Sequence, residues 1–296
     1  MTDQENLQIQ KNLFDIYSGI LFNNQEFASS GEMGEITYDF HCPEYKTLIE
    51  KYGIDKIAGE GTAFERAERL LHWMSPRLTH KSDYDNHIPF NSLDLLDYSL
   101  DKPEQGINCV NKAKILAECC LALGIYARRV HIIPYSPYDG DNHVVTEIYA
   151  PENSGWIMLD PSMDGYLIDE AGRPLSVLAV REKFALQEPV SFAACEEEKT
   201  DIQKLRDIHM EDNAYYCKNL FRIGVDIYNG FGPGDNNALW LIPVGYSVKR
   251  SILANIAYRM RCWPEGKDFF EEWLAKVQNQ PEPVPYAPAL LTAPPQ

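Results

Sequence analysis

The sequence predicts an α+β fold in which a central helix and antiparallel strands are flanked by further helices at both ends. Residues 63–78 carry an apolar stripe of period 3.6, which indicates an amphipathic helix. Residues 108–124 begin with a helix-capping asparagine and end with a glycine, which is typical of a complete helix. Residues 143–150 are rich in β-branched side chains and, with residues 155–160 beyond a short turn, predict a hairpin.

The part of the chain before residue 108 has helical character in four segments, residues 5–22, 43–53, 63–78 and 91–100. The second segment has Pro43 at its start and Gly53 just past its end. Pro76 should end or kink the third. Residues 79–107 form a long polar stretch, and loops of this length are usually binding or lid elements, or else disordered.

The central segment supplies the helix that begins at Cys109, with Asn108 as its N-cap and Gly124 at its end. Residues 126–133 read as the first strand after it, and the hairpin of residues 143–160 supplies two more.

The C-terminal part has weaker patterns. A short segment surrounds residues 166–168, and residues 200–228 and 248–260 are predicted to be helical. Residues 279–296 contain six prolines, so we expect a tail that is flexible or wraps the surface. We expect four parts: an N-terminal helical segment (residues 1–59), a core (60–190), a C-terminal helical region (191–278) and a Pro-rich tail (279–296).

The composition argues against several classes of partner. The formal net charge is −17 and the pI is near 4.8, so phosphate backbones and anionic membrane surfaces should be repelled. No run approaches the roughly 18 apolar residues of a membrane span. The polar start, Met1 to Asn6, lacks the features of a secretory signal, so we expect a cytoplasmic protein. The oligomeric state stays open.

The cysteine count is odd, with residues at 42, 109, 119, 120, 195, 217 and 262, and reduced thiols are the better interpretation. The sequence has no Cys-x-x-Cys, no His-Glu-x-x-His, no Gly-x-Gly-x-x-Gly and no phosphate-binding Gly-Lys-Ser/Thr loop. We therefore expect neither a metal nor a cofactor.

Cys109 is the candidate nucleophile. As the first residue of a helix it faces free backbone N–H groups and the positive end of the helix dipole, both of which favour a thiolate. The same N–H groups can stabilise an oxyanion after attack on a carbonyl. Cys119 and Cys120 lie mid-helix, where core packing is the expected role.

His143 is the candidate base and Asp160 its orienter. If Ala150 pairs with Gly155 across the turn, His143 and Asp160 become diagonal neighbours on one face, with Cα atoms about 7–8 Å apart. A carboxylate there can hold the imidazole and leave its other nitrogen for the thiol. His87 is the competing base, because Asp85-Asn86-His87 repeats the tripeptide that ends in His143.

These residues resemble the transglutaminase-like superfamily. Gly106-Ile107-Asn108-Cys109, residues 122–130, Asn142-His143 and Gly155-Trp156-Ile157-Met158-Leu159-Asp160-Pro161 match it in order and spacing over about residues 60–170. The resemblance implies a papain-like α+β core, in which the helix bearing the nucleophile packs on an antiparallel sheet. The chain differs from peptide N-glycanases, because it lacks their Cys-x-x-Cys zinc pairs. Nothing outside the core resembles the calcium-dependent cross-linking enzymes.

The expected function is cysteine-dependent acyl transfer on peptide or protein amide bonds, through a Cys109 thioester resolved most readily by water. The alternatives are a protein-glutamine transamidase, a non-catalytic transglutaminase-like binding module, and a scaffold whose tail and acidic surface recruit a partner. Gln105 or Asn108 is a candidate oxyanion donor, although capping is the simpler role for Asn108. Tyr166 is a candidate cleft residue.

Overall fold

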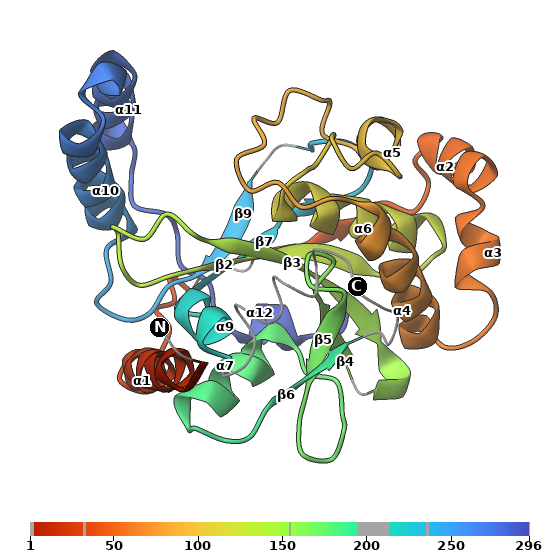
Figure 1. Ribbon diagram of the computed structural model, residues 1–296, viewed down its shortest axis with the longest axis horizontal. Coiled ribbons are helices and arrows are strands. Elements are labelled where there is room, and N and C mark those ends of the chain that lie inside the picture. The colour runs from red at the N-terminus through yellow and green to blue at the C-terminus, as the bar shows by residue number, and fades with distance from the viewer. Residues whose placement is uncertain (1–2, 32–33, 154, 195–212, 235–236, 296) are drawn as a thin grey trace.

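A five-stranded antiparallel sheet runs through the molecule in the order β4-β3-β2-β7-β9 (Figure 1). The computed structural model describes residues 3–31, 34–153, 155–194, 213–234 and 237–295. The strands are β2 Ala127–Ile133, β3 His143–Ala150, β4 Gly155–Leu159, β7 Arg222–Asp226 and β9 Ala238–Leu241. Two small sheets pair β1 Thr37–Tyr38 with β8 Tyr228–Asn229, and β5 Gly165–Ile168 with β6 Ser191–Ala194. The predicted α+β class is confirmed.

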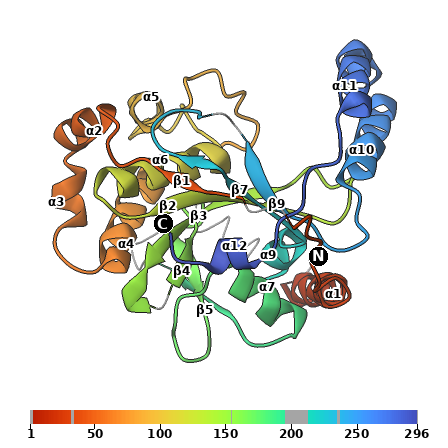
Figure 2. The same cartoon turned by 180° about the vertical axis from the view of Figure 1, so that it is seen from behind.

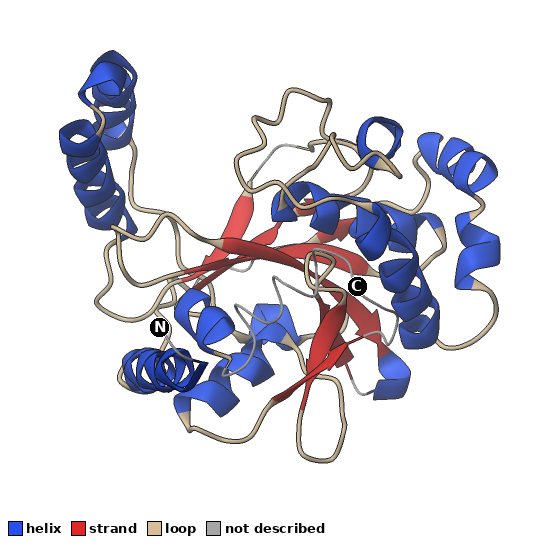
Figure 3. Ribbon diagram, in the orientation of Figure 1, coloured by secondary structure: helices blue, strands red, loops and turns tan. Residues whose placement is uncertain are grey.

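Helices cover both faces of the sheet, as the blue helices around the red strands show (Figure 3). One layer contains α6 Cys109–Ala122 with α2 Glu44–Tyr52, α3 Ile54–Ala58, α4 Ala63–Met74 and α5 Ser92–Ser99. The other contains α1 Asp3–Phe22, α7 Val177–Ala185, α9 Ala214–Asn219 and α12 Ala289–Thr292. Within the described ranges, no helix combines the length and the apolar character that crossing a bilayer requires.

Local sequence signals explain where the helices near the centre of the fold begin and end. Thr62 and Glu65 form a reciprocal capping box at the start of α4. The helix stops at Met74, and a 3-10 turn containing Pro76 follows, as the proline predicts. Gly124 lies just beyond α6 with φ near +75°, a conformation that a glycine adopts at little cost.

The predicted helix over residues 200–228 is wrong in its second half. Residues 200–212 lie outside the described residues, and α9 spans only Ala214–Asn219. Arg222–Asp226 is strand β7, which pairs with β2 and β9, so the region 191–278 is not simply helical. A Cβ on Gly224 would lie 2.6 Å from the Trp240 ring, so long-range packing against β9 decides this conformation.

The remaining C-terminal elements are a helical arm and a tail. Helices α10 Val248–Cys262 and α11 Lys267–Asn279 form a hairpin that projects from the body (Figure 2). The tail wraps the surface, one of the two expected states: Trp156 Nε1 donates to the Ala293 carbonyl at 2.9 Å, and Leu291 is buried.

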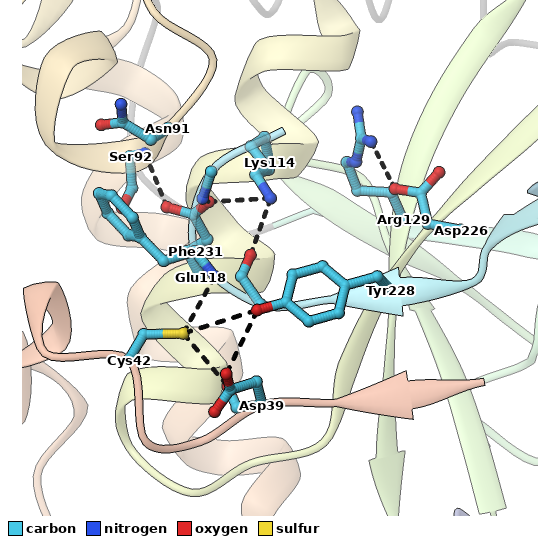
Figure 4. A network of polar contacts seen from close by, with 12 residues as sticks. Asp39, Cys42, Asn91, Ser92, Lys114, Glu118, Arg129, Asp226, Tyr228 and Phe231 are labelled. Carbon is cyan, nitrogen blue, oxygen red and sulfur yellow. Dashed lines mark hydrogen bonds and ion pairs between the residues drawn. The ribbon is translucent and has the colours of Figure 1, made fainter. Parts of the chain in front are cut away.

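A buried charged network joins α6 to the segment that follows β8. Glu118, which is fully buried, lies 2.9 Å from Lys114 Nζ and accepts hydrogen bonds from the backbone N–H groups of Ser92 and Gly232 (Figure 4). Lys114 also donates to the Gly230 carbonyl at 2.9 Å. The two charges therefore neutralise each other and fix three chain segments in one place.

We predict that Glu118→Leu lowers the free energy of unfolding by about 3–5 kcal/mol, because it leaves the buried Lys114 ammonium group without its carboxylate. Urea unfolding measures the loss. The control is Glu50→Leu, which breaks an exposed pair with Lys46 and should cost less than about 0.5 kcal/mol. Equal losses in the two variants would show that the network is not a stabilising feature.

Candidate active site

Cys109 occupies the first position of α6 and is partly exposed. The Asn108 side chain caps the helix, because its Oδ1 accepts hydrogen bonds from Asn111 N at 3.3 Å and Asn111 Nδ2 at 2.7 Å. Cys119 and Cys120 are fully buried, and desolvation raises the pKa of Cys120 to about 12. Among these three cysteines of α6, only Cys109 combines access to solvent with a helix N-terminus.

The hairpin brings His143 and Asp160 together. Ala150 pairs with Gly155 and Thr146 with Leu159, which is the register predicted from the sequence. His143, the first residue of β3, places Nε2 at 2.7 Å from Asp160 Oδ2, one residue beyond the end of β4. His143 is 2% exposed and Asp160 is fully buried. The contact thus lies outside bulk water, where a charged hydrogen bond is strong.

The Asp160 carboxylate accepts further hydrogen bonds. Oδ1 accepts from the backbone N–H groups of Ser162 at 2.8 Å and Met163 at 3.2 Å, and Oδ2 accepts from Tyr216 Oη at 2.6 Å. Burial by itself raises the pKa of Asp160, but the charge of His143 and these hydrogen bonds outweigh it and lower the pKa. Asp160 is therefore held as a carboxylate.

The imidazole of His143 is held as its charged form. Desolvation by itself lowers the pKa of His143, but the Asp160 carboxylate and hydrogen bonds with Asp160 and Cys109 raise the pKa to about 10. Since Nε2 faces Asp160, Nδ1 is the nitrogen left for the sulfur. An imidazolium in this place stabilises a thiolate and can later protonate a leaving amine.

Two tyrosines of α9 complete the surroundings of His143. The Tyr215 ring lies edge-on to the imidazole with centroids 5.4 Å apart, and Tyr216 lies at 6.2 Å. Neither tyrosine is predicted from the sequence, because both come more than 50 residues after Asp160 and carry no local motif. Only the tertiary packing of α9 brings them to the dyad.

The competing base, His87, has different contacts. It contacts Asp85 within the exposed part of the loop of residues 79–107, and its ring packs edge-on against Tyr84 and Tyr98. The histidine that contacts a buried carboxylate and Cys109 is His143.

The remaining candidates take other positions. Asn108 donates through Nδ2 to Asn86 Oδ1 at 3.3 Å in addition to capping α6, so both ends of its amide are engaged. Gln105 lies in the turn before Gly106, with its buried Oε1 accepting no hydrogen bond from the described residues. Tyr166 donates to Glu68 Oε1 at 2.8 Å and packs edge-on against Phe64, which places it beside α4.

Among the described residues, no three His, Cys, Asp or Glu side chains lie close enough together to hold a metal ion. Six described cysteines, residues 42, 109, 119, 120, 217 and 262, are free thiols.

Comparison with known proteins identifies a domain around these residues. Residues 51–161, which include Cys109, His143 and Asp160, match the profile of the Transglutaminase-like superfamily. The resemblance noted from the motifs is confirmed: the chain contains a transglutaminase-like domain. A solved structure described as a "putative cysteine protease" from Cytophaga hutchinsonii is similar over 60% of this chain and 62% of its own, with 16% sequence identity and a TM-score of 0.33. No curated protein matches the sequence.

We predict a two-sided pH dependence of the stability that the His143–Asp160 pair contributes. The pKa of His143 is raised from 6.5 to about 10, so its contribution is complete below pH 6.5 and disappears as the pH rises through about 10. The pKa of Asp160 is lowered, so its contribution disappears only as the pH falls through that lowered value.

The measurement is urea unfolding of the wild type and of His143→Gln/Asp160→Asn, a control that keeps both side chains polar without their titrations. The difference in unfolding free energy should be largest near pH 5–6 and should shrink towards pH 10. A constant difference between pH 6 and pH 10 would contradict the raised pKa of His143.

Proposed function

We propose that the protein is a cysteine-dependent acyl-transfer enzyme that hydrolyses amide bonds of peptides or proteins. The observation that carries the proposal is the buried 2.7 Å contact of His143 Nε2 with Asp160 Oδ2, in a histidine whose pKa the neighbouring Cys109 side chain also raises. A carboxylate–imidazole–thiol series of this kind is the arrangement that activates a nucleophile. The transglutaminase-like domain agrees with it, since this family consists largely of cysteine enzymes.

In the first half-reaction the Cys109 thiolate attacks the carbonyl carbon of the substrate amide and forms a C–S bond. The carbonyl oxygen becomes an oxyanion, which the backbone N–H groups at the start of α6 can stabilise. The intermediate collapses when its C–N bond breaks and the imidazolium of His143 transfers a proton to the leaving amine. The products are a thioester on Cys109, a free amine and a neutral imidazole.

In the second half-reaction His143 accepts a proton from water, and the resulting hydroxide attacks the thioester. The C–S bond breaks, the carboxylic acid leaves and the thiolate–imidazolium pair is restored. Asp160 keeps its charge throughout and holds the ring by Nε2, which is the role of the third member in other triads.

Water is the acceptor that we favour over a protein amine. Transamidation needs a channel that admits a lysine side chain and excludes water. Cys109 is partly exposed at the end of a helix, which supports an open approach of peptide and water to the sulfur. The net charge of −17 favours neutral or basic peptides over acidic ones as substrates.

We predict that His143→Ala abolishes turnover, with a loss of at least about 10³-fold, because the thiol then lacks its base and the leaving amine its acid. His87→Ala should stay within about twofold of the wild type, because His87 contacts Asp85 in an exposed loop. Asp160→Asn should fall between the two. Steady-state hydrolysis of a peptide amide measures all three, and a lethal His87→Ala variant would overturn the assignment of the base.

We predict that hydrolysis outpaces transamidation. A library of N-blocked peptide amides is incubated with and without a millimolar primary amine, and mass spectrometry follows the free acid, the amine adduct and acyl-Cys109. Cys109→Ala is the control for background cleavage. Faster formation of the amine adduct than of acid would favour the transamidase alternative. The absence of any acyl-Cys109 with every donor would favour the binding-module alternative.

A further inference from the structure

Lys112 is a fully buried lysine three residues after Cys109 on α6. Residues three apart on a helix share one side, so Lys112 lies one turn below the sulfur. Among the described residues its Nζ has no hydrogen-bond partner, although the residue is 0% exposed. Burying an unpaired ammonium group is costly, so its presence under a nucleophile requires an explanation.

The charged groups around Lys112 are those of the candidate site. The carboxylates of Asp160 and Asp164, and the sulfur of Cys109 when it is ionised, are the groups that favour the charged form of Lys112. Asp164 also contacts His72 on α4 at 3.2 Å. His80 is a further titratable neighbour, and desolvation together with the charge of Lys112 lowers the pKa of His80 to about 4, so His80 stays neutral.

The charge balance of this region explains what an ammonium group contributes. Two carboxylates, Asp160 and Asp164, act on Lys112 together with Cys109, and a thiolate there would add a third negative charge to this group. His143 supplies one positive charge when it is an imidazolium. Without a second buried cation, the carboxylates would oppose ionisation of the sulfur.

Lys114 provides the contrast on the same helix. It is also buried, but it pairs with Glu118 at 2.9 Å and donates to the Gly230 carbonyl, so its charge is neutralised locally (Figure 4). The two lysines thus differ in the property that matters: the charge of Lys114 is cancelled by its partner, whereas that of Lys112 acts on the candidate site.

We propose that Lys112 is a positioning residue for the thiolate: its buried ammonium group offsets Asp160 and Asp164 and thereby allows Cys109 to ionise. The inference deepens the proposed function and rests on it. Its cost should be visible in stability. Desolvation lowers the pKa of Lys112 from 10.5 to about 8, although the carboxylates favour its charged form. The cost of burying the charge is therefore complete below about pH 8 and disappears as the pH rises to 10.5.

The test is the pH dependence of Cys109 alkylation by iodoacetamide, followed by mass spectrometry of the Cys109 peptide. We expect Lys112→Met to move the acid limb of the rate profile up by about one pH unit, which is about a tenfold slower rate at a given pH on that limb. Lys114→Met, the matched buried control, should leave the limb in place. Lys112→Arg, which keeps the charge, should restore it.

Thermal unfolding separates this role from a structural one. Lys112→Met should raise the unfolding midpoint at pH 7, because it removes a buried unpaired charge, and the gain should shrink towards pH 10, where the wild-type lysine is neutral. A variant that is more stable yet slower to alkylate fits an electrostatic role, whereas a structural residue would lose both properties together.

The outcomes distinguish the role of Lys112 from the proposed function. If wild-type Cys109 reacts faster at low pH than the other thiols and Lys112→Met leaves its profile unchanged, the role of Lys112 is refuted and the proposed function stands. If wild-type Cys109 reacts no faster than an exposed thiol such as Cys262, the proposed function fails and the inference fails with it.

Discussion

The structure depends on one buried charged contact, the hydrogen bond between His143 and Asp160. Taking an imidazolium and a carboxylate out of water is expensive, and only good geometry and additional hydrogen bonds offset the cost. Each requirement is met from a different part of the chain: the β3–β4 register sets the distance, the turn after Asp160 supplies two N–H groups, and α9 supplies Tyr216. The site therefore requires the tertiary packing of α9 against the β3–β4 hairpin.

Helix α6 shows how such charges are distributed. A helix packed inside an α+β core is normally apolar on every buried side. Here Lys112, Lys114 and Glu118 are buried on it together with Cys119 and Cys120. The Lys114–Glu118 pair stabilises the junction with the segment after β8, while Lys112, three residues after Cys109, interacts with the charged groups of the candidate site. One helix thus contributes both an anchor for the scaffold and charge for the site.

The sequence predicts the parts of this arrangement that depend on near neighbours. The cap at Asn108, the start of α6 at Cys109 and the register from Ala150 to Gly155 follow from local rules, and they suffice to place a thiol, an imidazole and a carboxylate. Strand β7 was mistaken for helix, because its five residues gain their stability from β2 and β9 rather than from their own periodicity. The contact of Tyr216 with Asp160 and the burial of Lys112 cannot be predicted for the same reason. Neither is indicated by the residues next to it in the sequence.

This division between local and long-range determinants has a consequence for what the domain can do. The family match ends at residue 161, so it contains Cys109, His143 and Asp160 but not the tyrosines of α9 or strand β7. Tyr216 nevertheless donates the 2.6 Å hydrogen bond to the oxygen of Asp160 that also contacts His143. A donor at that oxygen competes with the imidazole for the carboxylate's charge, so it moderates how strongly Asp160 holds the proton on His143. The matched range thus contains the three residues of the candidate site, and a segment outside that range adjusts the basicity of His143.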